Sequence, residues 1–236
     1  MQVIPIENLL LAFLPAALVV GILHLWSRDA KETLYGFARM ILQLSFIGYF
    51  LIYLFEANTG WIVMAVLVLM VLVASWISLR TVDMPRTTLL PMALLSISVG
   101  GGSTLMVISQ GVLQLDPWYA PRFMVPLAGM IFAASMTSIS LAVERFVAEF
   151  AKTRSYETAR SIALKAALIP ITNSLFAVGL VSLPGMMTGQ ILSGVSPLVA
   201  ARYQIMVMCM MYAAAGLSSA GFLWALKSRL PLLAKE

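Results

Sequence analysis

Long apolar runs separated by short polar breaks dominate the chain. A helix that crosses a hydrocarbon core of about 30 Å needs roughly 20 mostly apolar residues. Seven runs come close to this length, at 8–26, 38–55, 61–79, 89–113, 123–143, 166–184 and 203–226. The pattern predicts an all-α polytopic membrane protein with about seven transmembrane helices in a single domain over residues 1–236.

The composition agrees with a membrane location. Hydrophobic residues make up 61% of the chain and charged residues 11%, whereas soluble domains carry about 25% charged residues. A soluble enzyme is therefore excluded. The single cysteine and the single histidine, Cys209 and His24, rule out an internal disulfide, a zinc cluster and a CxxC redox centre. We expect both side chains to serve in packing.

The positive charges predict the orientation of the chain. With seven spans and an external N-terminus, all but two of the 15 Lys and Arg residues fall on one side, the exceptions being Arg122 and Arg202. Cytoplasmic loops carry such an excess, so the C-terminus is expected in the cytoplasm. The basic charge thus reflects orientation in a lipid bilayer and indicates no binding of nucleic acid.

One cytoplasmic segment, 144–165, is long and lacks both Pro and Gly. Ser155 can cap a helix by accepting a hydrogen bond from a free backbone N–H, and Glu157 then lies near the positive end of the helix dipole. We therefore expect a break at Lys152 to Ser155, followed by a new helix.

This new helix is predicted to be short and amphipathic. Apolar residues recur at helical spacing along it, at Tyr156, Ala159, Ile162, Ala163 and Ala166. The pattern alone fits a connecting helix at the membrane surface as well as a helix that docks a partner subunit.

Three sequence strings extend beyond this helix. Residues 166–174 read AALIPITNS, 178–191 read VGLVSLPGMMTGQI and 202–207 read RYQIMV. They resemble the iron-export ABC permease family of the FetB type, which is related to plant aluminium-tolerance permeases. Arg39-x-x-x-Gln43-Leu44 in the second run and Val125 to Met130 in the fifth extend the resemblance over nearly the whole chain.

The resemblance implies a permease subunit in the cell (inner) membrane that exports iron or another metal. Such permeases work in pairs, which implies a homodimer here, and a separate cytoplasmic ABC ATPase binds ATP-Mg and contacts a coupling helix. This chain itself would hold no cofactor and no catalytic residue. Family members commonly have a Leu-Gly-Ala-Thr-Pro turn before that helix, where this chain reads KTRSYE. The implied ATPase-coupling residues are Ser155, Tyr156, Glu157 and Arg160.

The sixth run and the re-entrant-like stretch after it, 166–202, offer the best pathway element. Pro170 and Pro184 each remove a backbone donor, so carbonyls near Asn173 and within 180–190 are expected to be free. The candidate transport-path residues are Arg39, Gln43, Asn173, Pro184, Gly185, Met186, Met187 and Gln190. Thioethers favour soft ions such as Cu(I), and the spans embed no carboxylate that would chelate iron, so Met186 and Met187 are the only, weak, metal candidates.

Other interpretations remain. Gly100 to Gly102 lack the Lys of a phosphate-binding loop and are expected to pack helices closely. A membrane assembly or sensory subunit that recruits a soluble partner through its cytoplasmic helix is the alternative function. An intramembrane enzyme ranks last, because no pairing of a nucleophile with a base is visible in the sequence.

Overall fold

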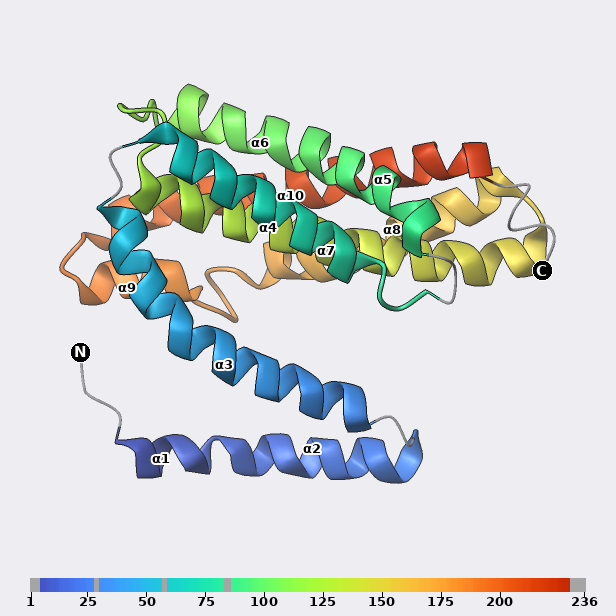
Figure 1. Cartoon of the computed structure of the whole chain (residues 1–236), viewed down its shortest axis with the longest axis horizontal. Helices are drawn as coiled ribbons and strands as arrows, with labels where there is room; N and C mark the ends of the chain where they lie inside the picture. The colour runs from blue at the N-terminus through green and yellow to red at the C-terminus, as the bar shows by residue number, and fades with distance from the viewer. Residues whose placement is uncertain (1–4, 28–29, 57–58, 83–85, 230–236) are drawn as a thin grey trace. The chain divides into compact units, whose positions relative to one another are not determined.

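The computed structural model describes residues 5–27, 30–56, 59–82 and 86–229. The chain divides into two compact units, 1–56 and 57–236, and Figure 1 shows the helices of each. Among the described residues, six helices are long and apolar enough to cross a membrane, and they are Glu7–Trp26, Ala30–Phe55, Gly60–Ser78, Arg86–Val112, Pro121–Thr153 and Pro197–Leu226. The chain is an all-α, multi-pass membrane protein.

The first unit is a pair of apolar helices. Its elements are α1 (Ile6–Leu11), which leads into α2 (Phe13–Trp26), and α3 (Ala30–Phe55). The rings of Phe13 on α2 and Phe37 on α3 lie 6.3 Å apart between centroids. None of the residues of α2 is buried. His24, which we expected to be packed, is exposed.

The second unit is a bundle in which each long helix runs opposite to the one before it in the chain. Its elements are α4 (Gly60–Ser78), α5 (Arg86–Ser96), η1 (Ile97–Gly101), α6 (Gly102–Met106), η2 (Val107–Val112), α7 (Pro121–Thr153), α8 (Tyr156–Ala177), α9 (Gly185–Leu192), α10 (Pro197–Leu226) and η3 (Lys227–Arg229). Elements α5, η1, α6 and η2 form one continuous rod, in which η1 and η2 are π-helical. Helices α7 and α10 run the same way (Figure 1).

Helix α8 returns along α7. Its first residue, Tyr156, contacts Phe146 near the end of α7, whereas Pro170 and Ile171 line a cavity with Met130 from the first half of α7. Because α7 and α10 are parallel, the segment between them has to travel back along the bundle. Helix α8 in that segment has 22 residues and is about 33 Å long, which is enough to cross a membrane. It is not among the six apolar spans, because its composition is less hydrophobic.

The sixth run is interrupted between α8 and α9, at 178–184, which overlaps the stretch expected around Pro184, but it is not interrupted near Asn173, where the expectation was wrong. The short cytoplasmic helix and the start of that run form one element, and α8 continues through Pro170 and past Asn173 to Ala177. A proline removes only one intrahelical hydrogen bond, and here the helix tolerates the loss. The chain leaves the helix at Val178, and Gly179 then adopts φ +85°, a conformation that favours glycine.

Small residues bring the η1 segment close to α10 at Gly100 and close to α7 at Gly101. A Cβ added at Gly100 would lie 2.7 Å from the backbone nitrogen of Ser218, and one at Gly101 would lie 3.2 Å from side-chain carbons of Ile131 and Phe132. Close packing, as expected for this tract, is confirmed at both positions. At Gly102 an added Cβ would meet nothing within 4 Å.

Buried serines join α7 to α10 in the same region. The hydroxyl of Ser135 donates to the carbonyl of Ala214 at 3.2 Å, that of Ser138 to Ala215 at 3.0 Å, and that of Ser218 to Ser135 at 2.9 Å. These hydroxyls satisfy one another and the backbone inside an otherwise apolar core. Cys209, by contrast, is exposed rather than packed.

Candidate functional site

The turn between α7 and α8 has the break and the cap that the sequence predicts. Arg154 follows the last residue of α7 with φ 51°, and its N–H donates to the carbonyl of Phe150 at 2.9 Å. Ser155 is extended, and its hydroxyl accepts the N–H of Thr158 at 3.4 Å. The left-handed residue ends one helix and the serine starts the next, so the chain reverses within two residues.

Tyr156 ties this turn to the end of α10. Its hydroxyl donates to the carbonyl of Leu223 at 2.9 Å, one of the last four carbonyls of α10, which lack an intrahelical donor. Its ring meets Phe146 edge-on at 5.8 Å, and Arg160 and Lys227 lie 5.4 and 5.6 Å from its centre. We call this set of Phe146, Tyr156, Arg160, Leu223 and Lys227 the Tyr156 junction.

The predicted coupling residues therefore divide into two groups. Ser155 and Tyr156 build the turn, and Tyr156 is only 8% exposed. Glu157 and Arg160 form an ion pair, and their side chains are 63% and 44% exposed. Of the four predicted coupling residues, Glu157 and Arg160 are therefore the two that carry exposed charge.

A buried carboxylate lies beside the junction and was not singled out from the sequence. The side chain of Glu149 is 10% exposed, and its oxygen lies 3.0 Å from Arg145 and 3.7 Å from Lys152. Spacings of four and three residues place these groups on one helix face. The spacing of Arg145, Glu149 and Lys152 is the sequence signal that could have revealed this cluster. Arg145 and Lys152 therefore pair with Glu149 inside the last turns of α7.

The predicted path residues of the second unit lie in different surroundings. Asn173 is exposed on α8, Pro184 precedes the first residue of α9, and Gly185 is the first residue of α9 and is exposed. Met187 is half-buried, and Met186 and Gln190 line a cavity.

That cavity, named here the α9 cavity, has a volume of about 530 Å³. It lies where α7 and α10 begin, at the end of the second unit that carries α9 (Figure 1). Its main lining residues are Arg122, Met130, Met186, Gln190, Tyr203 and Met206. The amide oxygen of Gln190 is buried and has no hydrogen-bond partner among the described residues. Arg122 and Tyr203 were not predicted as site residues.

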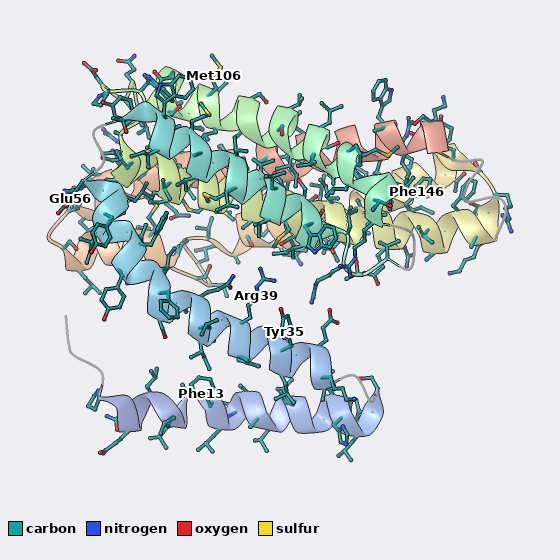
Figure 2. The ribbon with its side chains drawn as sticks, viewed as in Figure 1. Phe13, Tyr35, Arg39, Glu56, Met106 and Phe146 are labelled. Carbon is teal, nitrogen blue, oxygen red and sulfur yellow. The ribbon has the colours of Figure 1, made fainter. Side chains whose placement is uncertain are left out.

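Arg39 and Gln43, the remaining predicted path residues, lie one turn apart on α3, and Figure 2 shows Arg39 on that helix. Arg39 is half-buried and Gln43 is exposed. Both belong to the first unit, whereas α9 belongs to the second.

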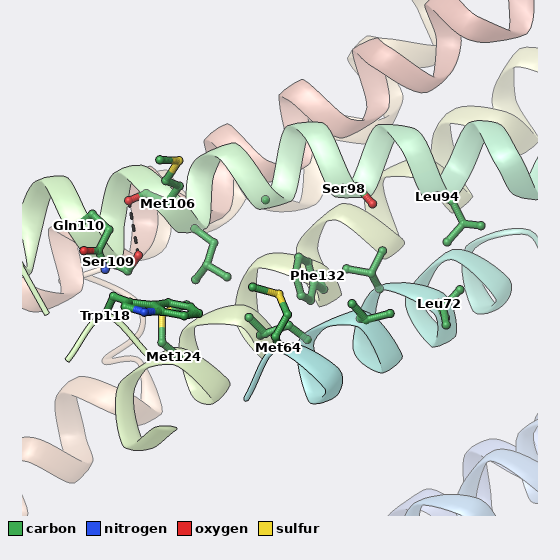
Figure 3. A pocket seen from close by; sticks show the side chains of 15 residues that line it. Met64, Leu72, Leu94, Ser98, Met106, Ser109, Gln110, Trp118, Met124 and Phe132 are labelled. Carbon is green, nitrogen blue, oxygen red and sulfur yellow. Dashed lines mark hydrogen bonds between the residues drawn. The ribbon is translucent and has the colours of Figure 1, made fainter. Parts of the chain in front are cut away.

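A larger cavity, of about 750 Å³, contains none of the predicted residues (Figure 3). Met64, Leu72, Leu94 and Phe132 contribute to its apolar walls, and Ser109, Gln110 and Trp118 lie together at one end of it. No charged side chain lines it among the described residues. The α9 cavity, which combines a cation with an unpaired amide, is therefore the better candidate for a ligand site.

Comparison with known proteins gives the chain its relatives. A protein of Arabidopsis thaliana named ALUMINUM SENSITIVE 3 is 34% identical over 86% of this chain and 81% of that protein. The probable iron export permease protein FetB of Escherichia coli is 31% identical over 90% of this chain and 87% of that protein. A UPF0014 membrane protein of Synechocystis is 35% identical over 75% and 74% of the two chains.

No solved structure matches the chain. The family model described as Uncharacterised protein family (UPF0014) matches residues 6–230. With nearly the whole length matched, and with relatives that align over most of their own length, this chain is a member of the UPF0014 family of membrane proteins.

Proposed function

We propose that the chain is the permease subunit of an ABC transporter that exports metal-containing cargo and takes its energy from a separate cytoplasmic ATPase. The observation that carries the proposal is the α7–α8 turn. An exposed Glu157–Arg160 ion pair lies there directly beside Tyr156, whose hydroxyl is hydrogen-bonded to the carbonyl of Leu223 on α10. The name of the Escherichia coli relative, a probable iron export permease, supports the direction and the cargo class.

The geometry suggests how ATPase movement reaches the transport path. When a partner bound to Glu157 and Arg160 changes position, it moves the first turn of α8 with it. Tyr156 passes this movement to Leu223 in the last turn of α10, and α10, a helix of 30 residues, extends about 45 Å. Its opposite end contributes Tyr203 and Met206 to the α9 cavity. One rigid helix thus joins the docking end to the cavity end.

In this proposal the remaining parts of the transporter lie outside the chain. ATP-Mg binds to the ATPase, and a second copy of the permease completes the path. The permease residues bind and guide cargo and perform no covalent chemistry. Arg39, Gln43 and Asn173 remain proposed path residues.

A charge swap tests the docking surface. The double variant Glu157→Arg/Arg160→Glu keeps one acid and one base on the same turn but reverses the charges shown to a partner. We expect it to bind the ABC ATPase of the same organism at least about tenfold more weakly, since charged contacts across an interface give much of its specificity. Co-purification and cargo efflux from proteoliposomes are the measurements.

The matched control is Lys165→Glu, which changes an exposed charge two turns further along α8. It should leave ATPase binding unchanged and should melt at the wild-type temperature. The charge swap should melt slightly lower, because it also removes the guanidinium of Arg160 from beside the Tyr156 ring. A wild-type protein that forms no complex with the ATPase would contradict the proposal. A complex that moves no cargo would instead favour an assembly or sensory subunit.

A further inference from the structure

We infer that the α9 cavity binds an organic anion, a molecule that joins a carboxylate or phosphate to an apolar body. This inference deepens the proposed function, because it names the class of cargo or ligand at that end of the bundle. A metal would then pass the cavity as part of an anionic chelate, and a bare cation would not bind there.

The charge of the cavity is the first argument. Arg122 is a lining residue, and no carboxylate is among the described side chains that line the cavity. Hard cations need several oxygen ligands, usually including carboxylates. In the described part of the chain no three His, Cys, Asp or Glu residues gather in a way that could hold a metal ion. A guanidinium without an acid beside it attracts an anion and repels a bare cation.

The second argument is the unpaired amide of Gln190. Its buried oxygen and that of Gln204 both lack a hydrogen-bond partner among the described residues, whereas buried polar atoms are normally paired. Of the two residues, Gln190 lines the α9 cavity. If the Gln190 side chain turns toward the cavity, a ligand with a hydroxyl or N–H group would supply the missing donor. Tyr203, which lines the same cavity, adds a hydroxyl that can donate to an anionic oxygen.

The size of the cavity and the chemistry of its wall also suit an organic ligand. A volume of about 530 Å³ falls within the usual range for small-molecule pockets, roughly 300 to 1,000 Å³. Phe123, Leu127 and Met130 give the cavity an apolar wall. Such a wall can pack against the carbon body of an organic ligand, whereas it offers no ligand atom to an inorganic ion.

The methionines require a separate test, since three thioethers can bind Cu(I). Met130, Met186 and Met206 line the α9 cavity. The larger cavity, however, is lined by three methionines as well, namely Met64, Met106 and Met124. Methionine side chains therefore line cavities of this chain generally, as adaptable apolar groups, and do not mark the α9 cavity as a metal site. What distinguishes the α9 cavity is its cation and its unpaired amide.

The experiment is ligand binding to the purified full chain in nanodiscs of neutral lipid, without any ATPase. The probes are phenyl phosphate, citrate, the Fe(III)–citrate chelate, Fe²⁺ and Cu⁺, followed by calorimetry and by the shift in melting temperature. We expect phenyl phosphate, which joins an anionic group to an apolar ring, to bind, and citrate and its Fe(III) chelate, which lack an apolar body, to bind more weakly. Arg122→Gln should weaken binding at least tenfold, and Gln190→Leu several-fold. Fe²⁺ and Cu⁺ alone should not bind.

Arg202→Gln is the control, because it removes a neighbouring positive charge that does not line the cavity, and it should bind as the wild type does. Nanodiscs that contain phosphatidylglycerol test a lipid source. If this lipid alone competes in an Arg122-dependent manner, the anion is a headgroup and the inference holds.

Cu⁺ binding that disappears in Met186→Leu, or anion binding that survives Arg122→Gln, would overturn the inference. The binding test contains no ATPase, so the two proposals can fail separately. If the chain binds the anion but forms no complex with the ATPase, only the proposed function is refuted. If it forms that complex but binds no anion, only this inference is refuted.

Discussion

Replacing Gly100 with alanine is expected to destabilise the protein strongly. The added Cβ would lie 2.7 Å from both the backbone nitrogen and the hydroxyl of Ser218 and 3.0 Å from the backbone carbonyl carbon of Leu217. Backbone atoms of α10 cannot move aside as a flexible side chain does, so η1 and α10 have to separate. Overpacking of a core costs about 1–3 kcal/mol and occasionally more, and we expect the upper part of that range. Thermal unfolding of the purified protein in detergent measures the effect.

Gly102→Ala is the matched control, because it makes the same change two residues along the same rod, where an added Cβ meets nothing within 4 Å. Alanine favours helix over glycine by up to about 1 kcal/mol, so this variant should melt at or above the wild-type temperature. Equal melting temperatures for the two variants would show that η1 does not pack against α10 as described.

Removing the hydroxyl of Tyr156 is expected to separate ATP consumption from transport. Tyr156→Phe keeps the ring beside Phe146 but leaves the carbonyl of Leu223 without its donor, a loss of about 1–3 kcal/mol for a buried group. The exposed Glu157 and Arg160 stay in place, so the ATPase should still bind. We expect the cargo moved per ATP to fall several-fold, as measured in proteoliposomes. Tyr156→Ala, which also removes the ring, should abolish transport.

Tyr212→Phe provides the comparison, since it removes a hydroxyl from a ring on α10 that is 42% exposed. It should transport normally. Full transport by Tyr156→Phe would rule out the junction as the link. Loss of ATPase binding in this variant would instead mean that Tyr156 shapes the docking surface itself.

The features that sequence alone could predict are those set by neighbouring residues. Apolar runs predict spans because the requirement for about 20 apolar residues acts on each segment separately. The break after Thr153 and the Ser155 cap depend on residues within one turn, and both are observed. The Gly100–Gly101 packing was recognisable because three adjacent glycines have few other uses inside a membrane helix.

The features that escaped prediction depend on distant segments. Tyr156 is buried because it meets Leu223, 67 residues away, which no local pattern reveals. The α9 cavity combines Arg122 from α7 with Gln190 from α9 and Tyr203 from α10, and only the packing of these helices brings them together. Pro170 was overestimated as a helix breaker, because a proline removes only one intrahelical hydrogen bond and α8, which packs along α7, continues through it.

The proposed orientation places the α7–α8 turn in the cytoplasm and the α9 end of the bundle outside. Labelling with a membrane-impermeant thiol reagent tests it most directly. The background is Cys209→Ser, because Cys209 is an exposed free thiol, and single cysteines are then placed at Glu157 and Asp116, both exposed. We expect Glu157→Cys to react only in inside-out vesicles and Asp116→Cys only in intact cells. Reaction of Glu157→Cys in intact cells would contradict it.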